Sequence, residues 1–404
     1  MPRRDFLKRG AVLAAFAAGI GGIEALRKGW DLYEQDKTWI EASRPNAHFL
    51  SRYAKDLQRL TLAGSFAPEE WTLDGPAQSA AQKALDLAVR ELGMRQLRLG
   101  IRWNRAGKSE AIDLAPYRAT LDYCLANEVD LCLNVGPIRV FRWPEEHVSR
   151  EVLANTVLPA NRATIRPGDL LARRAIDYLD GLLGALRREY GASPRLRLVQ
   201  IENEPFYPLG EHEWVMSQDY LSLLARHVHA ALPDSGLLVT SAGRLDLNNV
   251  RDLFARLLEE DASWAGRLVS GFDFHYRTPL RDSFPIIRHF DQITYARPFA
   301  PRPAEHVWAA RDMGFGIEVS EGQAEPYDYF TEPGNSARDF RFLILRCLDK
   351  VLDPAKPALI RIWGVEHLTK RMLSGDLDEK HREIIEIIQT VNGVGAGLAQ
   401  RATA

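Results

Sequence analysis

The chain has 404 residues, of which 46% are hydrophobic and 26% charged, and its formal net charge is −2. This composition is typical of a globular protein with a large core, built either as one barrel with extensions or as two or three domains. The balanced charge does not favour nucleic acid or an anionic membrane surface as a partner, whereas a neutral sugar requires no net charge.

The N-terminus differs from the rest of the chain. A basic start, "MPRRDFLKRG", precedes an Ala/Gly-rich apolar run that is interrupted at Glu24. The run is too short and too weakly apolar for a typical membrane-spanning helix, and "RRDFLK" resembles a twin-arginine export signal. We therefore expect residues 1–30 to be an export signal or a membrane anchor, and the protein to be periplasmic or extracellular. An amphipathic N-terminal helix is the structural alternative.

Three cysteines, Cys124, Cys132 and Cys347, lie in apolar surroundings where a free thiol behaves as a small hydrophobic group. The sequence has no CxxC, no His-x-x-x-His and no calcium-loop pattern. We predict no metal site and no cofactor.

Short apolar runs alternate with helix-like segments along most of the chain. The runs are 60–67, 96–103, 130–137, 196–203, 236–242, 271–276, 314–321 and 358–364, and clear helical spacing covers 80–92, 171–190, 218–232 and 336–352. Eight such repeats predict a single (β/α)8 TIM barrel over 59–395. A doubly wound open sheet is less favoured, because no Gly-rich phosphate loop follows the first run.

Two of the remaining segments, 31–58 and 138–168, lack a clear core pattern. We interpret 31–58 as an N-terminal arm, 138–168 as a long loop over one barrel face, and 396–404 as a tail.

Polar and aromatic residues stand where the predicted strands end, which in such barrels is the face that carries the active site. These residues are Arg98, Trp103, Asn134, Asn203, Glu204, His275, Tyr276, Glu321 and Trp363. Glu204 and Glu321, on the fourth and seventh strands, would face each other across the barrel mouth. Two carboxyl groups about 5–5.5 Å apart are what retaining glycoside hydrolysis requires, one protonated as acid and then base, the other ionised as nucleophile.

Five segments carry a family resemblance in barrel order: "LRLGIRW", "VGPIRVFRWPEEH", "VQIENEPFYPLGE", "IEVSEGQAEPY" and "RIWGVEHL". Over about residues 60 to 370 the chain resembles the clan-A retaining glycoside hydrolases, particularly the family-five-like cellulase group. The resemblance implies that Glu204 is the acid/base and Glu321 the nucleophile. The chain departs from the family at Gly322 and Tyr327, where Leu and Trp are usual, and Asp246 is the one candidate for the acidic residue that often follows the fifth strand.

The same resemblance suggests roles for the predicted substrate-binding residues. Asn203 would bind the sugar 2-hydroxyl, Arg98 would keep Glu321 ionised, and Tyr276 would donate to the nucleophile. His275 would bridge to either glutamate or be a core histidine. Trp363 and Trp103 offer faces for sugar stacking, with a place in the core as the alternative, and Trp143 is a candidate for an outer subsite.

Other acidic residues near the two glutamates have competing readings. Glu202 points to the opposite face from Asn203 and is expected to be structural. Glu318 and Glu325 are rivals of Glu321 for the nucleophile, and Glu366 either contacts sugar hydroxyls or caps the next helix.

Three functions compete. The favoured hypothesis is an exported retaining glycoside hydrolase that cleaves O-glycosidic bonds in an oligosaccharide or polysaccharide, with no obligate protein partner indicated. An inactive carbohydrate-binding barrel would have lost one of the glutamates, and both are present. A lyase or aldolase that depends on a metal or phosphate would need a strand-end lysine or a metal cluster, which the sequence does not offer.

Overall fold

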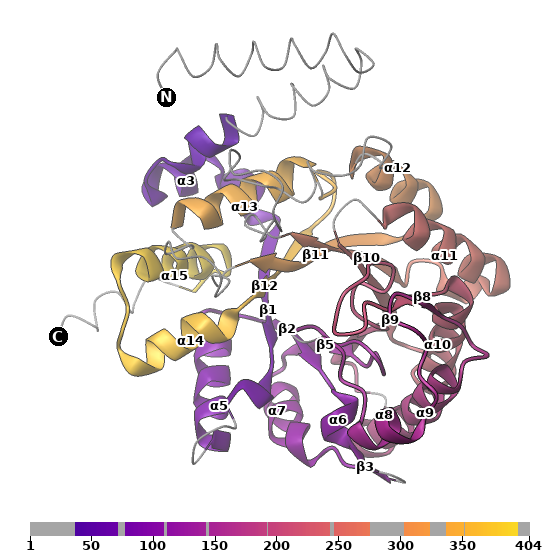
Figure 1. Ribbon diagram of the computed structural model, residues 1–404. Coiled ribbons are helices and arrows are strands. Elements are labelled where there is room, and N and C mark those ends of the chain that lie inside the picture. The colour runs from indigo at the N-terminus through magenta and orange to yellow at the C-terminus, as the bar shows by residue number, and fades with distance from the viewer. Residues whose placement is uncertain are drawn as a thin grey trace.

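A computed structural model describes residues 37–71, 77–108, 111–142, 145–191, 193–242, 246–274, 303–323, 337–350 and 352–394. Within them, eight strands form one barrel: β1 (Leu60–Phe66), β2 (Gln96–Gly100), β5 (Asp130–Asn134), β7 (Leu196–Gln200), β9 (Gly236–Ser241), β10 (Leu268–Phe274), β11 (Gly316–Gln323) and β12 (Ala358–Trp363). All neighbouring pairs are parallel, and β1 pairs with β12 to close the ring (Figure 1). The (β/α)8 prediction is confirmed, and each predicted strand segment overlaps one barrel strand.

Helices surround the barrel and connect its strands (Figure 1). They are α5 (Ala77–Asp86) with the π-helical turn η2 (Leu87–Glu91), α7 (Ala115–Ala126), α9 (Leu170–Tyr190), α10 (Gln218–Ala231), α11 (Leu247–Glu260), α12 (Pro303–Met313), α13 (Ala337–Lys350), α14 (Val365–Ser374) and α15 (Glu379–Val391). On α9, Ala175, Tyr178, Leu182 and Leu186 recur every three or four residues and are buried. This spacing lines one side of a helix and explains why it packs on the barrel.

Shorter helices and strands lie outside the barrel strands and the main helices. They are α3 (Asn46–Arg52), α4 (Ala54–Gln58), η1 (Pro68–Trp71), α6 (Trp103–Ala106), β3 (Gly107–Lys108), β4 (Ala111–Ile112), α8 (Arg150–Asn155), β6 (Thr164–Ile165), β8 (Val215–Met216) and η3 (Ala262–Trp264). In the part of the chain that the structure describes, no helix combines the length and apolar character needed to cross a membrane.

The barrel interior is distinct from the core beneath the helices. Cys132, Leu198 and Leu238 form a small buried cluster of their own, while Leu131 and Leu133 belong to the larger core. Because side chains alternate along a strand, this division places the first group inside the barrel. All three cysteines are buried, as their apolar surroundings predict, and all three are unpaired.

The two segments without a clear core pattern are more structured than expected. Within 37–58, Ala42, Phe49 and Leu57 are buried, and Asn46 donates to Glu386 on α15 at 2.7 Å. The 138–168 segment contains α8 and β6 and buries Ile138 among other residues. Their apolar residues are too sparsely spaced to show a helical or strand period, yet they complete the core through tertiary contacts.

Candidate active site

Glu204 and Glu321 lie at the same end of the barrel, because parallel strands all end at one face. Glu321 is within β11, and Glu204 follows β7 by four residues. The chain leaves β7 through left-handed backbone at Glu202 (φ 53°) and Glu204 (φ 41°), which few non-glycine residues adopt. Such strained backbone persists where the surroundings enforce it, and it clusters at functional sites.

Glycine at position 136 permits this turn. A β-carbon on Gly136 would come within 2.5 Å of the Glu202 backbone, so the chain after β5 can lie against the turn only without a side chain there.

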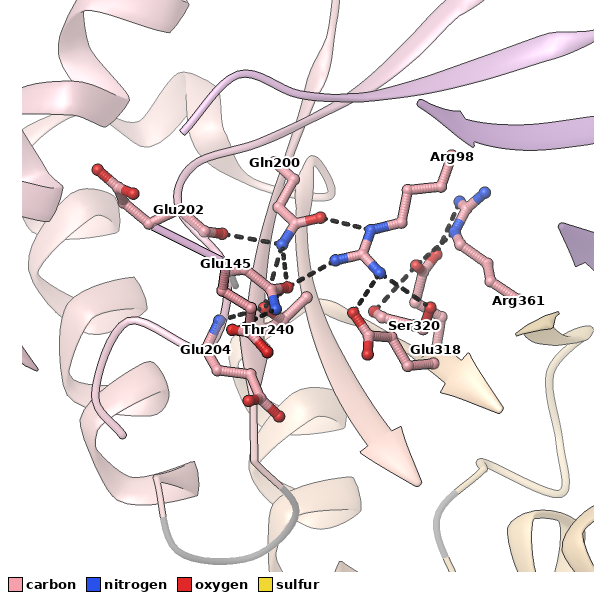
Figure 2. A network of polar contacts seen from close by, with 11 residues as sticks. Arg98, Glu145, Gln200, Glu202, Glu204, Thr240, Glu318, Ser320 and Arg361 are labelled. Atoms are coloured by element: carbon pink, nitrogen blue, oxygen red, sulfur yellow. Dashed lines mark hydrogen bonds and ion pairs between the residues drawn. The ribbon is translucent and has the colours of Figure 1, made fainter. Parts of the chain in front are cut away.

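Arg98 on β2 connects the two sides of the site. Its guanidinium is fully buried and donates to Glu321 at 2.7 Å, to Asn203 Oδ1 at 2.7 Å and to Gln200 Oε1 at 2.7 Å (Figure 2). The ring of Phe141 lies 4.3 Å from the guanidinium carbon. A cation this close favours the ionised form of the Glu321 carboxyl, which is the form a nucleophile needs.

The orientation of Asn203 follows from the same network. Its Oδ1 accepts from Arg98, from Gln200 at 3.0 Å and from Thr240 at 3.3 Å. Its amide nitrogen is thereby directed to the opposite side, where Glu145 lies 3.4 Å away. The Thr240 hydroxyl also accepts from the backbone N–H of Glu204 at 2.9 Å, which fixes the turn that carries this glutamate.

The carboxyl of Glu204 has a very different environment from that of Glu321. Removal from water, then the negative charges of Glu145 and Glu321, raise its pKa well above the ordinary value, and a hydrogen bond with Asp273 opposes only part of this effect. Glu204 therefore holds a proton where an ordinary glutamate would have lost it.

Two further carboxyl groups, Glu145 and Asp273, belong to the site and were missed from the sequence. Loss of hydration and the charge of Glu321 raise the pKa of Glu145 to about 7, although its side chain remains partly exposed at the mouth. Burial and the charges of Glu321 and Glu204 raise the pKa of Asp273 well above its ordinary value. A sequence signal existed for Asp273, since it stands two positions before His275 in the predicted strand segment 271–276, and alternate residues of a strand are expected on one face.

Neighbouring glutamates have structural roles. Glu202 points away from the cluster (Figure 2) and accepts from the backbone of Arg139 at 2.5 Å and from the hydroxyl of Tyr220 at 3.0 Å. Glu318 forms a buried ion pair with Arg361 at 2.7 Å inside the barrel. The structural reading of Glu202 is confirmed, and Glu318 is already committed to Arg361.

The two predicted sugar-stacking residues, Trp363 and Trp103, have different surroundings. Trp363 ends β12, and the guanidinium of Arg142 lies 5.2 Å from its ring centre. Arg142 in turn forms a 2.6 Å ion pair with Glu366, which also accepts from the backbone of Ala67 at 2.5 Å. Glu366 thus holds the loop after β5 against the end of β1.

Trp103 is closely packed, with 5% of its surface exposed. Tyr178 stacks on one side at 5.0 Å, and a β-carbon on Gly107 would come within 2.5 Å of the indole ring. A place in the core was the alternative for Trp103, and its ring forms a core contact between α6 and α9, while its role toward a sugar stays a prediction. Next to it, β3 and β4 pair as a two-stranded antiparallel sheet, which the strand-end pattern did not indicate.

Several predicted residues cannot be placed. His275, Tyr276, Trp143, Glu325 and Tyr327 lie outside the described residues. Asp246 is buried just before α11, and burial raises its pKa to about 6. Among the residues that the structure describes, no group of three or more His, Cys, Asp or Glu side chains could hold a metal ion.

No protein-family model matches this sequence, and no curated protein matches it. Solved structures similar to the chain include xylanase 10B from Thermotoga maritima, which is 13% identical, with 84% of this chain and 97% of that one covered and a TM-score of 0.48. A GH5 family lichenase from Caldicellulosiruptor sp. F32 is 12% identical, with 84% and 94% covered and a TM-score of 0.49. The catalytic domain of a mannanase from Streptomyces sp. SirexAA-E is 12% identical, with 76% and 74% covered and a TM-score of 0.42. At these identities the resemblance is one of overall fold.

Proposed function

We propose that this protein is a retaining glycoside hydrolase in which Glu204 is the acid/base and Glu321 the nucleophile. The observation that carries the proposal is the contrast between the two carboxyl groups at one end of the barrel. Glu321 is paired with a buried guanidinium at 2.7 Å, while burial and neighbouring charges raise the pKa of Glu204. Retaining hydrolysis needs one ionised and one protonated carboxyl.

The reaction follows from this division. Glu204 gives its proton to the glycosidic oxygen as the bond to the anomeric carbon breaks, and a Glu321 oxygen forms an ester with that carbon. Glu204, now a carboxylate, then takes a proton from water as the water attacks the same carbon and releases Glu321. Two displacements on opposite faces retain the anomeric configuration. Asn203 supports the proposal because its amide nitrogen is turned toward Glu145 and away from Arg98, available to a sugar hydroxyl.

The experiment that tests this assignment uses Glu321→Ala and Glu204→Ala on aryl glycosides and on β-linked glucans, mannans and galactans. Glu321→Ala should abolish turnover. Glu204→Ala should still form the glycosyl-enzyme from a dinitrophenyl glycoside, because that leaving group needs no proton, and added azide should restore turnover with retained product. Glu259→Ala, an exposed glutamate on α11, is the control and should leave activity unchanged.

Two outcomes contradict the assignment. An inverted azide adduct from Glu204→Ala would mean that Glu204 is the nucleophile and Glu321 the acid/base. A wild-type protein that hydrolyses none of these substrates but binds one of them supports an inactive carbohydrate-binding barrel instead.

Export is a separate part of the proposal and depends on "RRDFLK" alone. Arg3→Lys combined with Arg4→Lys should trap the protein in the cytoplasm, since twin-arginine transport reads that pair. Normal export of the double variant, measured by cell fractionation, contradicts the signal assignment.

A further inference from the structure

A second buried carboxyl lies directly against the proposed acid/base. Asp273, on β10, is 0% exposed, and neither of its oxygens receives an N–H or O–H donor from the described residues. The carboxyl of Glu204 lies close enough to the Asp273 side chain that each of the two groups acts on the pKa of the other through its charge and at hydrogen-bonding range. Two carboxylates repel each other, so a hydrogen bond between them requires a proton shared by the pair.

An irregularity in the sheet places Asp273 there. Along β10 and β11, Phe272 pairs with Val319, but the next residue, Asp273, pairs with Glu321. The register skips Ser320, which is the signature of a β-bulge on β11. The skip sets Asp273 beside the proposed nucleophile in the ladder while its carboxyl reaches the proposed acid/base.

The charges around the pair keep the proton in place. The groups that face it are Glu321 on β11, Glu145 and Arg139 after β5, Asp246 before α11, and Arg98 on β2. Arg98 is already committed to Glu321. The surroundings therefore disfavour a second negative charge on the pair for as long as Glu321 is ionised.

On this basis, and resting on the function proposed above, we infer that Asp273 is a positioning residue that shares one proton with Glu204. The pair releases this proton when Glu321, the nucleophile, loses its negative charge. Before reaction, Glu321 and the pair carry one negative charge each. When the ester forms, Glu321 loses its charge, the shared proton moves to the leaving oxygen, and both Glu204 and Asp273 are carboxylates. The total stays at two negative charges, and water returns the proton to the pair as the ester is hydrolysed.

The test compares Asp273→Asn with Asp246→Asn, which removes another buried carboxyl near Glu204 that is not hydrogen-bonded to it. In Asp273→Asn the new amide donates to Glu204 and stabilises its carboxylate. The basic limb of the pH profile of kcat/KM should therefore move down by about one pH unit or more. The rate loss should be at least about tenfold greater for a phenyl than for a dinitrophenyl leaving group. Asp246→Asn should shift that limb by less.

A readout independent of activity separates this inference from the proposed function. Infrared spectra of the folded protein at neutral pH should contain a protonated carboxylic acid band that loses the intensity of one group in both Asp273→Asn and Glu204→Gln. The inference is overturned if both variants retain the band. It is also overturned if Asp273→Asn is active, the basic limb of its pH profile does not move, and its rate losses on the phenyl and dinitrophenyl substrates are equal. An inactive wild type overturns the proposed function, while the infrared comparison still decides whether the proton is shared.

Discussion

At the scale of single residues, Arg98 is the group on which the site depends most. Its buried guanidinium reaches acceptors on three separate side chains, Glu321, Asn203 and Gln200. The planar fork of arginine can serve all three at once, whereas a lysine ammonium is a point charge on a flexible stem. Geometry, and not charge alone, therefore makes this position specific for arginine.

We predict that Arg98→Lys lowers kcat at least about 100-fold, because Asn203 and Glu321 lose their fixed positions. Stability should also fall, by about 3 kcal/mol, because buried acceptors are left without donors. The matched control is Arg361→Lys, which disturbs the buried pair with Glu318 inside the barrel. It should reduce stability in urea unfolding while the folded fraction keeps its kcat. Equal kcat losses in the two variants would contradict the role given to Arg98.

How far the sequence predicts the site also becomes clear at this scale. Glu204, Glu321, Asn203 and Arg98 were predicted from strand-end motifs, and the structure brings all four together. The motifs carry no information on a skipped register or on left-handed backbone. The skipped register between β10 and β11 brings Asp273 into the site, and Glu145, in the loop after β5, has left-handed backbone (φ 67°).

At the scale of elements, the strands were predictable because each is a short apolar run between clear helical patterns, buried on both faces as parallel barrel strands are. The N-terminal arm was not predictable, because its contacts with the core come from isolated residues and not from a periodic apolar pattern. Trp39 packs edge-on against Phe342 of α13 at 5.2 Å, and Arg341 donates to the backbone of Ala42 at 2.8 Å. The segment near α3 thus lies against α13 and α15 (Figure 1).

The arm should consequently contribute to stability. Phe49, on α3, is 1% exposed, and we predict that Phe49→Ala lowers the free energy of unfolding by about 3–4 kcal/mol through the cavity it leaves. Ile40, in the same segment, is 51% exposed, and Ile40→Ala should change stability by less than about 0.5 kcal/mol. Denaturant unfolding of both variants measures this. A small effect for Phe49→Ala would mean that the arm is not part of the cooperative unit.

At the scale of the whole molecule, buried ionisable groups act on stability in opposite directions. Burial raises the pKa of Glu145 and of Glu202 to about 7, so both bind more protons folded than unfolded, and stability is lost as pH rises toward 7. Burial lowers the pKa of His147 to about 3 and of His367 to about 4. For these histidines the unfolded chain binds more protons, so their contribution is present above about pH 6.5 and is lost as pH falls.

These opposing contributions predict where stability is greatest. Between about pH 4.5 and 6.5 the histidine effects offset part of the carboxyl effects, because the two have opposite slopes there. Above about pH 6.5 the histidines become neutral in both states, while the Glu204–Asp273 pair, whose pKa values are raised well above normal, still holds a proton only when folded. Stability should therefore decline from about pH 6.5 to 8.5, in contrast to a protein whose carboxylates are all paired with cations.

Thermal unfolding across this range tests the prediction, with Glu145→Gln as the diagnostic variant. Removing this carboxyl deletes a group that the folded protein must ionise against Glu321, so the variant should gain about 1 kcal/mol or more at pH 8 and little at pH 4. The wild-type curve should fall more steeply than the variant's between these limits, since only the wild type releases that proton. A wild-type midpoint that rises steadily to pH 8.5, or a variant that runs parallel to it, would show that the four carboxyl groups are ionised without cost and that Glu204 is not held as an acid.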